Sequence, residues 1–458
     1  MKISFRLNGA SVSAIAPTGT ETLLEYLRQD VGLCGTKEGC NEGDCGACSV
    51  IVTGKDGVPQ SMNACILFLP QIQGRSVRTV EGISGPDGTL HPVQEAMIAQ
   101  HGAQCGFCTP GFITTMAAAH ANGENDFDTA LAGNLCRCTG YAPIVRAAQL
   151  ANQEPVPKWM QEDLELVSKI ESSESIFCPK SADELAHWYK ENPGATLVAG
   201  GTDIGLWVTK QMRDFGKLAF LGHAEDLRQI EDCGDYLRVG ATVTIAALMT
   251  AIQPLYPSFY GMLLRYGSAQ VRNAATIGGN IANGSPIGDG PPALIALGTT
   301  LILRQGKNYR RMPLEDYFLA YQKQDRLSGE FVESIELRKD QINLRCYKLS
   351  KRFDQDISAV CGCINIRIED NIIKSARIAF GGMAATPARA KITEKTLVGM
   401  EWSLQTFEST KSVLLQDFSP MSDARASAAY RSESAQNMLL RYFNEIQGAA
   451  INILEVHP

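Results

Sequence analysis

The chain has 458 residues, which at roughly 150 residues per domain is enough for about three domains with separate hydrophobic cores. Hydrophobic residues make up 45% of it and charged residues 20%, which excludes a disordered or fibrous protein. The 42 basic and 49 acidic residues give a net charge of −7, the wrong sign for a protein that binds nucleic acid or anionic lipid. Cysteine is the unusual component, because nine of the 14 cysteines lie within the first 138 residues.

From the N-terminal residues we expect no targeting segment. Residues 1–9 alternate apolar and polar side chains, as a half-buried strand does, and no apolar core or cleavage site of a signal peptide follows. No apolar run reaches the length of about 18 residues that a membrane-spanning helix needs. We therefore expect a cytoplasmic protein without membrane contact, in which clustered cysteines hold metal more often than they form disulfides.

The periodicity of the chain changes several times and predicts five segments. Residues 1–85 combine short strands, tight turns and one helical pattern at 23–27, whereas residues 86–152 have helical periodicity at 93–101, 111–121, 129–135 and 144–151. Residues 153–175 contain two prolines and an acidic excess, which is typical of an exposed linker. Residues 176–344 alternate β-branched strands with helices and glycine turns, and residues 345–458 contain strands at 361–368 and 375–380 followed by helices.

The first cysteine motif is Cys40-x4-Cys45-x2-Cys48, followed by Cys65. This is the spacing of plant-type [2Fe–2S] ferredoxins. Two ferric ions and two sulfides need four thiolates, and the glycines at 39, 43 and 46 allow the backbone to fold tightly around such a group. A zinc site is the alternative, but zinc ligands usually come as separated cysteine pairs.

The second motif consists of two cysteine pairs, Cys105-x2-Cys108 and Cys136-x-Cys138, separated by a helical stretch. Each pair precedes a predicted helix start, where free N–H groups and the helix dipole favour an anionic group. Taken alone, these pairs also fit structural zinc. Beside a ferredoxin-type loop, they favour a second [2Fe–2S] cluster.

Two glycine turns in the third segment favour a dinucleotide. A strand runs into Gly200 and Gly201 within residues 197–204, and a second glycine turn lies within residues 276–289. Neither is the Rossmann fingerprint, but exposed N–H groups at such turns bind pyrophosphate without a lysine. Taken by itself, the first of them is better explained as a plain strand-to-helix turn.

Three motifs together resemble the molybdenum hydroxylases: Gly35–Cys48, Gln104–Gly111 and Asn134–Tyr141. The resemblance implies a multidomain α+β fold. Its domains would be a β-grasp ferredoxin-like domain (1–85), a four-helix [2Fe–2S] bundle domain (86–152), a two-part α/β FAD-binding domain (176–344) and a C-terminal α+β flavoprotein subdomain (345–458), with a linker over 153–175.

The resemblance also implies the site residues. The metal ligands would be Cys40, Cys45, Cys48, Cys65, Cys105, Cys108, Cys136 and Cys138. FAD contacts would be Leu197, Val198, Ala199, Gly200, Gly201, Thr202, Asp203, Ile204, Tyr266, Thr276, Gly279, Asn280, Asn283, Asp289, Val332 and Lys348. Gln104 would approach the pterin of a molybdenum cofactor on a partner subunit. The remaining cysteines are expected to be ordinary thiols, with Cys361 and Cys363 side by side in a buried strand.

The function implied by the resemblance is electron transfer. The chain is similar to the iron–sulfur and FAD subunit of bacterial xanthine dehydrogenase, and would pair with a large molybdenum subunit in a heterotetramer. Electrons from hypoxanthine or xanthine would pass through both clusters to FAD and then to NAD⁺. No histidine lies in a catalytic pattern, so substrate hydroxylation is not expected on this chain. The alternatives are a hydroxylase of the same family acting on an aldehyde, nicotinate or carbon monoxide, and a non-enzymatic assembly protein stabilised by zinc.

Overall fold

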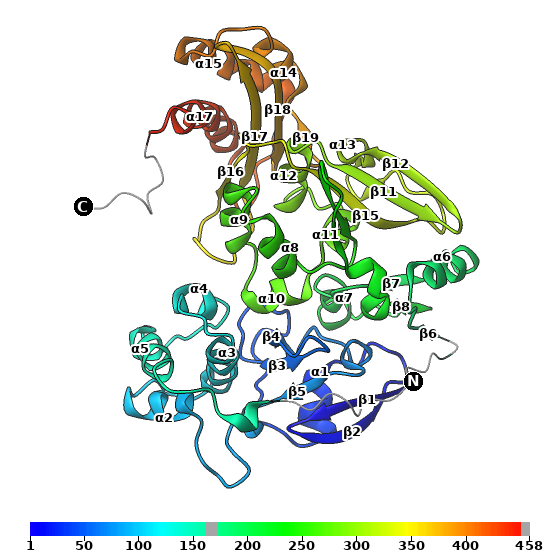
Figure 1. Cartoon of the computed structure of the whole chain (residues 1–458), viewed down its shortest axis with the longest axis vertical. Coiled ribbons are helices and arrows are strands. Elements are labelled where there is room, and N and C mark those ends of the chain that lie inside the picture. Colours follow the sequence, from blue (N-terminus) through cyan, green and yellow to red (C-terminus); the bar gives the residue numbers. More distant parts are fainter. Residues whose placement is uncertain (162–172, 174, 450–458) are drawn as a thin grey trace.

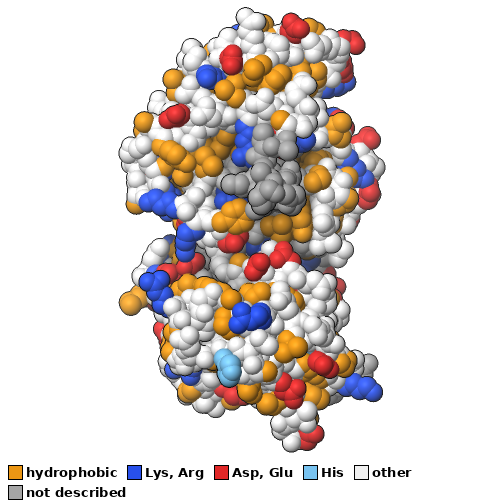
Figure 2. Space-filling view, turned by 90° about the vertical axis from the view of Figure 1, so that its left-hand side faces the viewer, with side chains coloured by type: hydrophobic (Ala, Val, Ile, Leu, Met, Phe, Trp, Pro, Cys, Tyr) orange, Lys and Arg blue, Asp and Glu red, His pale blue; other side chains and the backbone are white. Residues whose placement is uncertain are grey.

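The computed structural model describes the whole chain except residues 162–172, 174 and 450–458. In Figure 1 the first 150 residues, coloured blue to cyan, form a lower lobe, and the green to red elements lie above it. The space-filling view shows an indentation between these lobes (Figure 2). Most of the predicted linker at 153–175 lies outside the described residues.

The N-terminal sheet unit is a mixed five-stranded sheet in the order β2-β1-β5-β3-β4, in which β1 and β5 are parallel. Ile3, Phe5 and Leu7 of β1 face its core, as their alternation predicts. A short helix packs Leu23 and Leu24 into the same core and continues as a π-helical turn at Tyr26–Asp30. The elements are β1 (Lys2–Leu7), β2 (Ala10–Ile15), α1 (Leu23–Glu25), β3 (Ser49–Thr53), β4 (Pro59–Asn63) and β5 (Ser76–Arg78).

The helical unit contains the four predicted helices: α2 (Pro92–Ala99), α3 (Thr109–Ala121), α4 (Phe127–Leu131) and α5 (Ala142–Ala151). Helix α3 is its centre, because ten of its residues, 111–120, are buried. The third helix was expected at 129–135 but begins earlier, because the Asp126 side chain accepts a hydrogen bond from the Thr129 N–H and caps it. It also ends earlier, because the Leu135 N–H bonds to the Cys45 carbonyl instead.

The central unit has two parts. A small parallel sheet of β6 (Ile176–Phe177), β8 (Leu218–Phe220) and β7 (Thr196–Val198) is followed by an antiparallel sheet in the order β12-β11-β15-β10-β9. The strands of the second sheet are β9 (Ile230–Asp232), β10 (Tyr236–Gly240), β11 (Thr300–Gln305), β12 (Asn308–Pro313) and β15 (Phe331–Arg338), and a hairpin of β13 (Phe318–Ala320) and β14 (Lys323–Gln324) lies beyond its edge. The helices are α6 (Ala182–Glu191), α7 (Ile204–Thr209), α8 (Ile245–Ile252), α9 (Pro257–Leu264), α10 (Ala269–Ala274), α11 (Ile277–Asn283), α12 (Gly290–Ala296) and α13 (Leu314–Tyr317).

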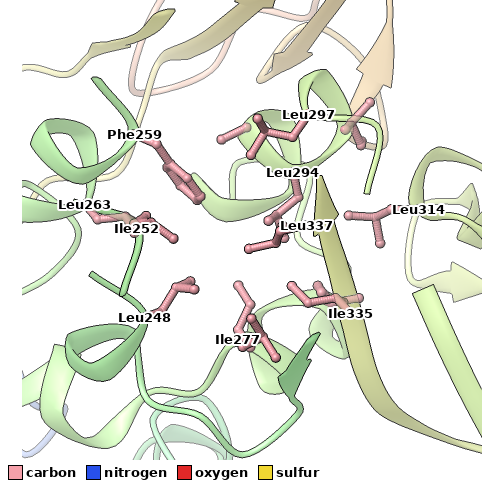
Figure 3. Packing of buried hydrophobic residues seen from close by; sticks show 14 of the residues in the cluster. Leu248, Ile252, Phe259, Leu263, Ile277, Leu294, Leu297, Leu314, Ile335 and Leu337 are labelled. Carbon is pink, nitrogen blue, oxygen red and sulfur yellow. The ribbon is translucent and has the colours of Figure 1, made fainter. Parts of the chain in front are cut away.

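The main hydrophobic core lies between the antiparallel sheet and its helices (Figure 3). Ile335 and Leu337 of β15 meet Leu248 and Ile252 of α8 and Leu294 of α12. Burying this face fixes α8, α11 and α12 on the sheet, and thereby positions the glycine turn that opens α11.

The C-terminal unit is an antiparallel sheet of β16 (Arg345–Leu349), β17 (Val360–Glu369), β18 (Ile372–Gly381) and β19 (Ala388–Arg389). The helices that follow are α14 (Lys391–Leu397), α15 (Leu404–Thr410), α16 (Leu414–Asp417) and α17 (Ala428–Ile446). Cys361 and Cys363 are fully buried on one face of β17, as expected. Cys34 is exposed, however, because it follows the turn at Gly32 on the surface.

The predicted multidomain α+β architecture is confirmed in chain order. In the described ranges, no helix combines the length and apolar character that crossing a membrane requires.

Candidate cofactor sites

The first four cysteines meet at one end of the N-terminal sheet unit. Cys40 and Cys45 come from the loop before β3, Cys48 directly precedes that strand, and Cys65 follows β4. Hydrogen bonds with Cys45 and Cys65 hold the pKa of the Cys40 thiol far below its ordinary value. Cys65 also contacts Cys48, and its thiol pKa is raised by these contacts and by burial. The thiol contacts therefore run in series from Cys45 to Cys40, Cys65 and Cys48, which brings all four thiols together.

The loop around these thiols needs its glycines. A Cβ on Gly39 would lie 2.7 Å from the Cys45 sulfur, and Gly43 has a φ of +79°. The N–H groups of Asp44 and Cys45 each donate to the Cys40 sulfur over 3.3 Å. The loop thus provides thiols together with N–H donors, which is what an anionic cluster needs.

The other four cysteines meet in the helical unit. Cys108 is the N-cap residue of α3, and Cys136 and Cys138 lie shortly before α5. The sulfurs of Cys105 and Cys138 are 3.4 Å apart. Cys108 contacts Cys136, and burial followed by that contact raises the pKa of the Cys108 thiol to about 12. Cys105 and Cys138 are exposed, whereas Cys136 is buried.

The two thiol groups are joined by a direct backbone contact. The N–H of Leu135, next to Cys136, donates to the carbonyl of Cys45 over 2.9 Å. Gly46 allows this approach, because a Cβ there would lie 2.2 Å from the Gly133 carbonyl oxygen. The Asn134 side chain adds a hydrogen bond to the Gly46 carbonyl over 3.1 Å.

A cavity of about 330 Å³ lies between the two parts of the central unit. The turn after β7 and the start of α11 line it, so the two predicted glycine turns face the same space. The predicted FAD residues that line it are Leu197, Ala199, Gly200, Gly201, Thr202, Asp203, Ile204, Tyr266, Thr276, Gly279, Asn280, Asn283 and Val332.

Close packing forces glycine at this turn. A Cβ on Gly200 would lie 2.1 Å from the Ala274 carbonyl oxygen, and Gly201 has a φ of +75°. The Asn280 amide donates to the Tyr266 hydroxyl over 3.3 Å, and burial raises the pKa of that phenol. The Asn283 amide bonds to the Asp203 carboxylate over 3.1 Å. These contacts orient polar groups around a recess with room for an extended ligand.

Three of the predicted FAD residues do not line the cavity. Val198 points into a separate apolar cluster with Phe68 and Phe220. Asp289 and Lys348 form a buried ion pair with one another, and Ser358 donates to the same carboxylate. This pair joins the central unit to the C-terminal unit.

The cavity is also lined by residues that the sequence did not indicate. Trp207 of α7 lines it, and the Arg213 guanidinium lies 4.5 Å from the centre of its ring. Tyr189 and Arg326 approach from α6 and from the segment after β14, and Arg326 donates to the Tyr189 hydroxyl over 3.0 Å. No local motif marks these residues, because they reach the cavity only through the packing of distant elements.

The first thiol group lies close to this cavity. Ile66, next to Cys65, packs so tightly against α7 that a Cβ on Gly205 would lie 2.8 Å from the Ile66 Cβ. The Gln71 amide donates to the Ala199 carbonyl over 3.0 Å, and the Thr209 hydroxyl donates to the Asn41 carbonyl over 2.8 Å. The cysteine loop and the glycine turn are therefore held against one another.

These residues fit the two kinds of group that their chemistry suggests. Grouped thiols with N–H donors suit a [2Fe–2S] cluster, in which each iron takes two protein thiolates. Within the described residues, no three His, Cys, Asp or Glu side chains are grouped around a single point as the ligands of one metal ion would be. The glycine-lined cavity suits a dinucleotide.

Comparisons with known proteins agree with this geometry. Four family models match: a 2Fe–2S iron–sulfur cluster binding domain at 5–69, a [2Fe–2S] binding domain at 79–149, the FAD binding domain in molybdopterin dehydrogenase at 169–338 and the CO dehydrogenase flavoprotein C-terminal domain at 345–446.

Similar curated proteins are xanthine dehydrogenases. That of Emericella nidulans is 31% identical over 97% of this chain and 38% of its own length, and that of Drosophila subobscura is 31% identical over 88% of this chain and 36% of its own length. The chain thus spans less than two fifths of each of these relatives.

Solved structures share part of the fold. The reconstituted CO dehydrogenase from Oligotropha carboxidovorans has a TM-score of 0.54 at 25% identity, covering 60% of this chain and 97% of that one. Quinoline 2-oxidoreductase from Pseudomonas putida 86 has a TM-score of 0.55 at 22% identity, with the same coverage. The four family models match in succession, and xanthine dehydrogenases match along nearly the whole chain, so the chain combines two iron–sulfur cluster binding domains, an FAD-binding domain of the molybdopterin dehydrogenase type and a C-terminal flavoprotein domain.

Proposed function

We propose that this chain is the electron-transfer subunit of a xanthine dehydrogenase. In this proposal a large partner subunit carries the molybdenum cofactor and oxidises hypoxanthine or xanthine, and NAD⁺ is the final electron acceptor. The carrying observation is the unbroken set of contacts from the exposed thiols of Cys105 and Cys138 to the glycine-lined cavity. The names of the matched relatives support xanthine as the substrate.

The eight cysteines in the two thiol groups would hold two [2Fe–2S] clusters, and the cavity would hold FAD. When bound, the clusters carry single electrons, whereas flavin collects two and can pass them on as a hydride. The protein would hold these groups at fixed distances from one another. The Leu135 N–H bonds to the Cys45 carbonyl between the two thiol groups, and Ile66 packs against Gly205 beside the cavity. Arg326 is well placed to balance the negative charge of a pyrophosphate, because it and Asp203 are the charged side chains that line the cavity.

We propose that the partner covers the exposed edge of the helical unit, in a cytoplasmic heterotetramer. Cys105 and Cys138 are exposed there, together with Gln104. Large apolar side chains near these thiols in the sequence are also exposed: Phe107 is 48% exposed and Leu135 is 61% exposed. Apolar surface around a redox centre favours a dry contact with a partner.

The test is to purify the chain together with its partner and to measure iron, acid-labile sulfide, flavin and xanthine-dependent NAD⁺ reduction. We expect about four iron and four sulfide per chain, with one FAD. Cys45→Ser should remove about half of the iron, whereas Cys34→Ser, which alters an exposed cysteine outside the motif, should remove none. Stoichiometric zinc without iron would support the assembly-protein alternative and refute this proposal. Xanthine oxidation by the pure chain would refute the division of labour between the subunits.

A second candidate is the corresponding component of another molybdenum hydroxylase. The likeness to CO dehydrogenase structures and to the CO dehydrogenase flavoprotein C-terminal domain favours it. Assaying the same complex with carbon monoxide, an aldehyde and nicotinate separates the two. Activity with one of these substrates and none with xanthine would select the second candidate.

A further inference from the structure

A second, smaller cavity of about 130 Å³ lies at the seam between the N-terminal sheet unit and the central unit. Arg75, from the turn before β5, forms one wall. His223 and Arg228, from two short 3₁₀ helices after β8, form another. It is separate from the larger cavity. The wall between the two is formed by residues that line both, namely Ala199, Gly200, Thr242 and Thr276.

The two arginines of this cavity have no direct partner among the described residues, because neither the Arg75 nor the Arg228 guanidinium makes a hydrogen bond or ion pair there. Asp56 and Glu225 nevertheless lie near enough to act electrostatically on Arg75 and His223, respectively. Among the residues that the structure describes, Asp56 is the one acidic residue that lines the cavity, and it lies beyond ion-pair distance of both arginines. Lys55, nearby, is already paired with Glu225 over 2.7 Å.

Neighbouring positive charges add to burial in disfavouring protonation of the bases at this cavity. Burial and the neighbouring Arg228 lower the pKa of Arg75 to about 10. Burial, followed by Arg75, Lys55 and Arg228, lowers the pKa of His223 to about 4. Both lowered pKa values mean that a further positive charge is disfavoured at this cavity. A bound anion would make both pKa shifts smaller.

A neutral donor lies in the wall between the two cavities. Thr242 lines both of them and is 4% exposed, and its hydroxyl has no hydrogen-bond partner among the residues that the structure describes. Thr244 and Ala247, at the start of α8, also line the smaller cavity, but the Thr244 hydroxyl accepts the Ala247 N–H and the Ala275 carbonyl accepts the Ile245 N–H, so these N–H groups of the helix start already have partners. A buried hydroxyl without a partner is costly unless a ligand or water satisfies it.

We propose that this seam cavity binds a phosphate-class oxyanion. Two guanidinium groups and a buried hydroxyl, all without a partner among the described residues, together match the donors that such anions take. The cavity is much smaller than the one assigned to FAD, so a single phosphoryl group fits it better than a dinucleotide does. The bound anion would tie Arg75 of the N-terminal sheet unit to Arg228 of the central unit.

The experiment uses the holoprotein in phosphate-free buffer. Calorimetric titration and thermal unfolding are recorded with inorganic phosphate, with AMP and with sodium chloride at matched ionic strength. We expect saturable binding of phosphate or AMP and a rise in Tm that chloride does not produce. Tighter binding of inorganic phosphate would identify the free ion as the ligand, and tighter binding of AMP would identify a phosphomonoester.

Matched variants locate the site. Arg75→Gln and Arg228→Gln should each weaken binding by about tenfold, since each removes a charge-assisted hydrogen bond. Lys307→Gln, which removes an exposed cation from the turn between β11 and β12, should leave the affinity unchanged. Arg228 is exposed, so its variant will fold even if the Arg75 variant does not. The absence of binding by both phosphate compounds, or equal binding by wild type and the Arg228 variant, would overturn the proposal.

Discussion

His91 is a buried histidine whose neutral form is built into the helical unit. Its Nδ1 accepts a hydrogen bond from the Val93 N–H over 3.1 Å and caps α2. Its ring packs edge-on against His120, with ring centres 5.4 Å apart. Burial, then His120 and Arg78, lower the pKa of His91 to about 4. Protonation would add the proton at Nδ1, the atom that accepts the Val93 N–H, and would therefore remove this cap as well as bury a charge.

This geometry predicts that acid destabilises the helical unit. The pKa is lower in the folded state than the ordinary 6.5, so the unfolded chain binds more protons and stability falls as pH drops from about 6.5 towards 4. The free energy of unfolding should fall by about 2 kcal/mol between pH 7 and pH 5. Hydrogen exchange of α2 amides, corrected for intrinsic rates, measures it. His91→Asn, which keeps a capping acceptor, should remove most of the dependence, whereas the exposed His101→Asn should not. An unchanged pH dependence in the His91 variant would contradict this.

At the scale of elements, the loop of the first thiol group and helix α3 meet through glycines. A Cβ on Gly111 would lie 2.2 Å from the Gly46 carbonyl oxygen, and a Cβ on Gly46 would lie 2.2 Å from that of Gly133. The glycines thus allow three backbone segments to come into direct contact between the two thiol groups. Their spacing along the sequence shows only that turns are present.

Gly46→Ala should therefore lower the free energy of unfolding by more than the replacement of a glycine with a positive φ normally does. Gly140 is a matched control, since its φ of +69° is close to the +68° of Gly46 but its Cβ would meet nothing within 4 Å. Gly140→Ala should cost about 1–2 kcal/mol from backbone strain alone. Gly46→Ala should lower Tm further and reduce the iron content of the purified protein. Equal Tm values and iron contents in the two variants would show that the contact is unimportant.

At the scale of the whole molecule, the lobes are joined by buried polar contacts. Gln270 of α10 is 1% exposed, and its amide nitrogen lies within hydrogen-bond distance of Ser49, Thr115 and Asn134. These three residues belong to the N-terminal sheet unit and the helical unit, whereas Gln270 belongs to the central unit. Figure 1 shows α10 at the contact between the lobes. Gly133 leaves room for this side chain, because a Cβ there would collide with the Gln270 carbonyl oxygen.

Gln270→Leu should destabilise the assembly of the lobes by about 1–3 kcal/mol, because buried hydroxyl and amide groups lose their partner. Calorimetry should show one unfolding transition separating into two, with the N-terminal lobe and the remainder melting independently. Gln253→Leu, at the exposed end of α8, is the control and should leave the transition unchanged. A single unshifted transition in the Gln270 variant would refute the role of this contact.

Much of the architecture followed from local patterns. Cysteine spacing, glycine turns and helical periodicity act over a few residues, so the sequence alone indicated the order of the units, the four helices and both thiol groups. The predicted domain boundaries, metal ligands and individual FAD contacts remain predictions. Asn134, Gln270 and Ile66 were not recognised as connecting residues, because their contacts join parts of the chain that are far apart in sequence.

The sequence by itself determined which chemistry the chain can support, because thiol and glycine motifs carry their function within short segments. Only the tertiary structure decided which residues share a space. It paired Asp289 with Lys348 outside the cavity, brought Trp207 and Arg326 into it, and placed Arg75 beside Arg228 at a seam. These outcomes depend on how whole units pack against one another. Such packing is set by the summed burial of many side chains and not by any single motif.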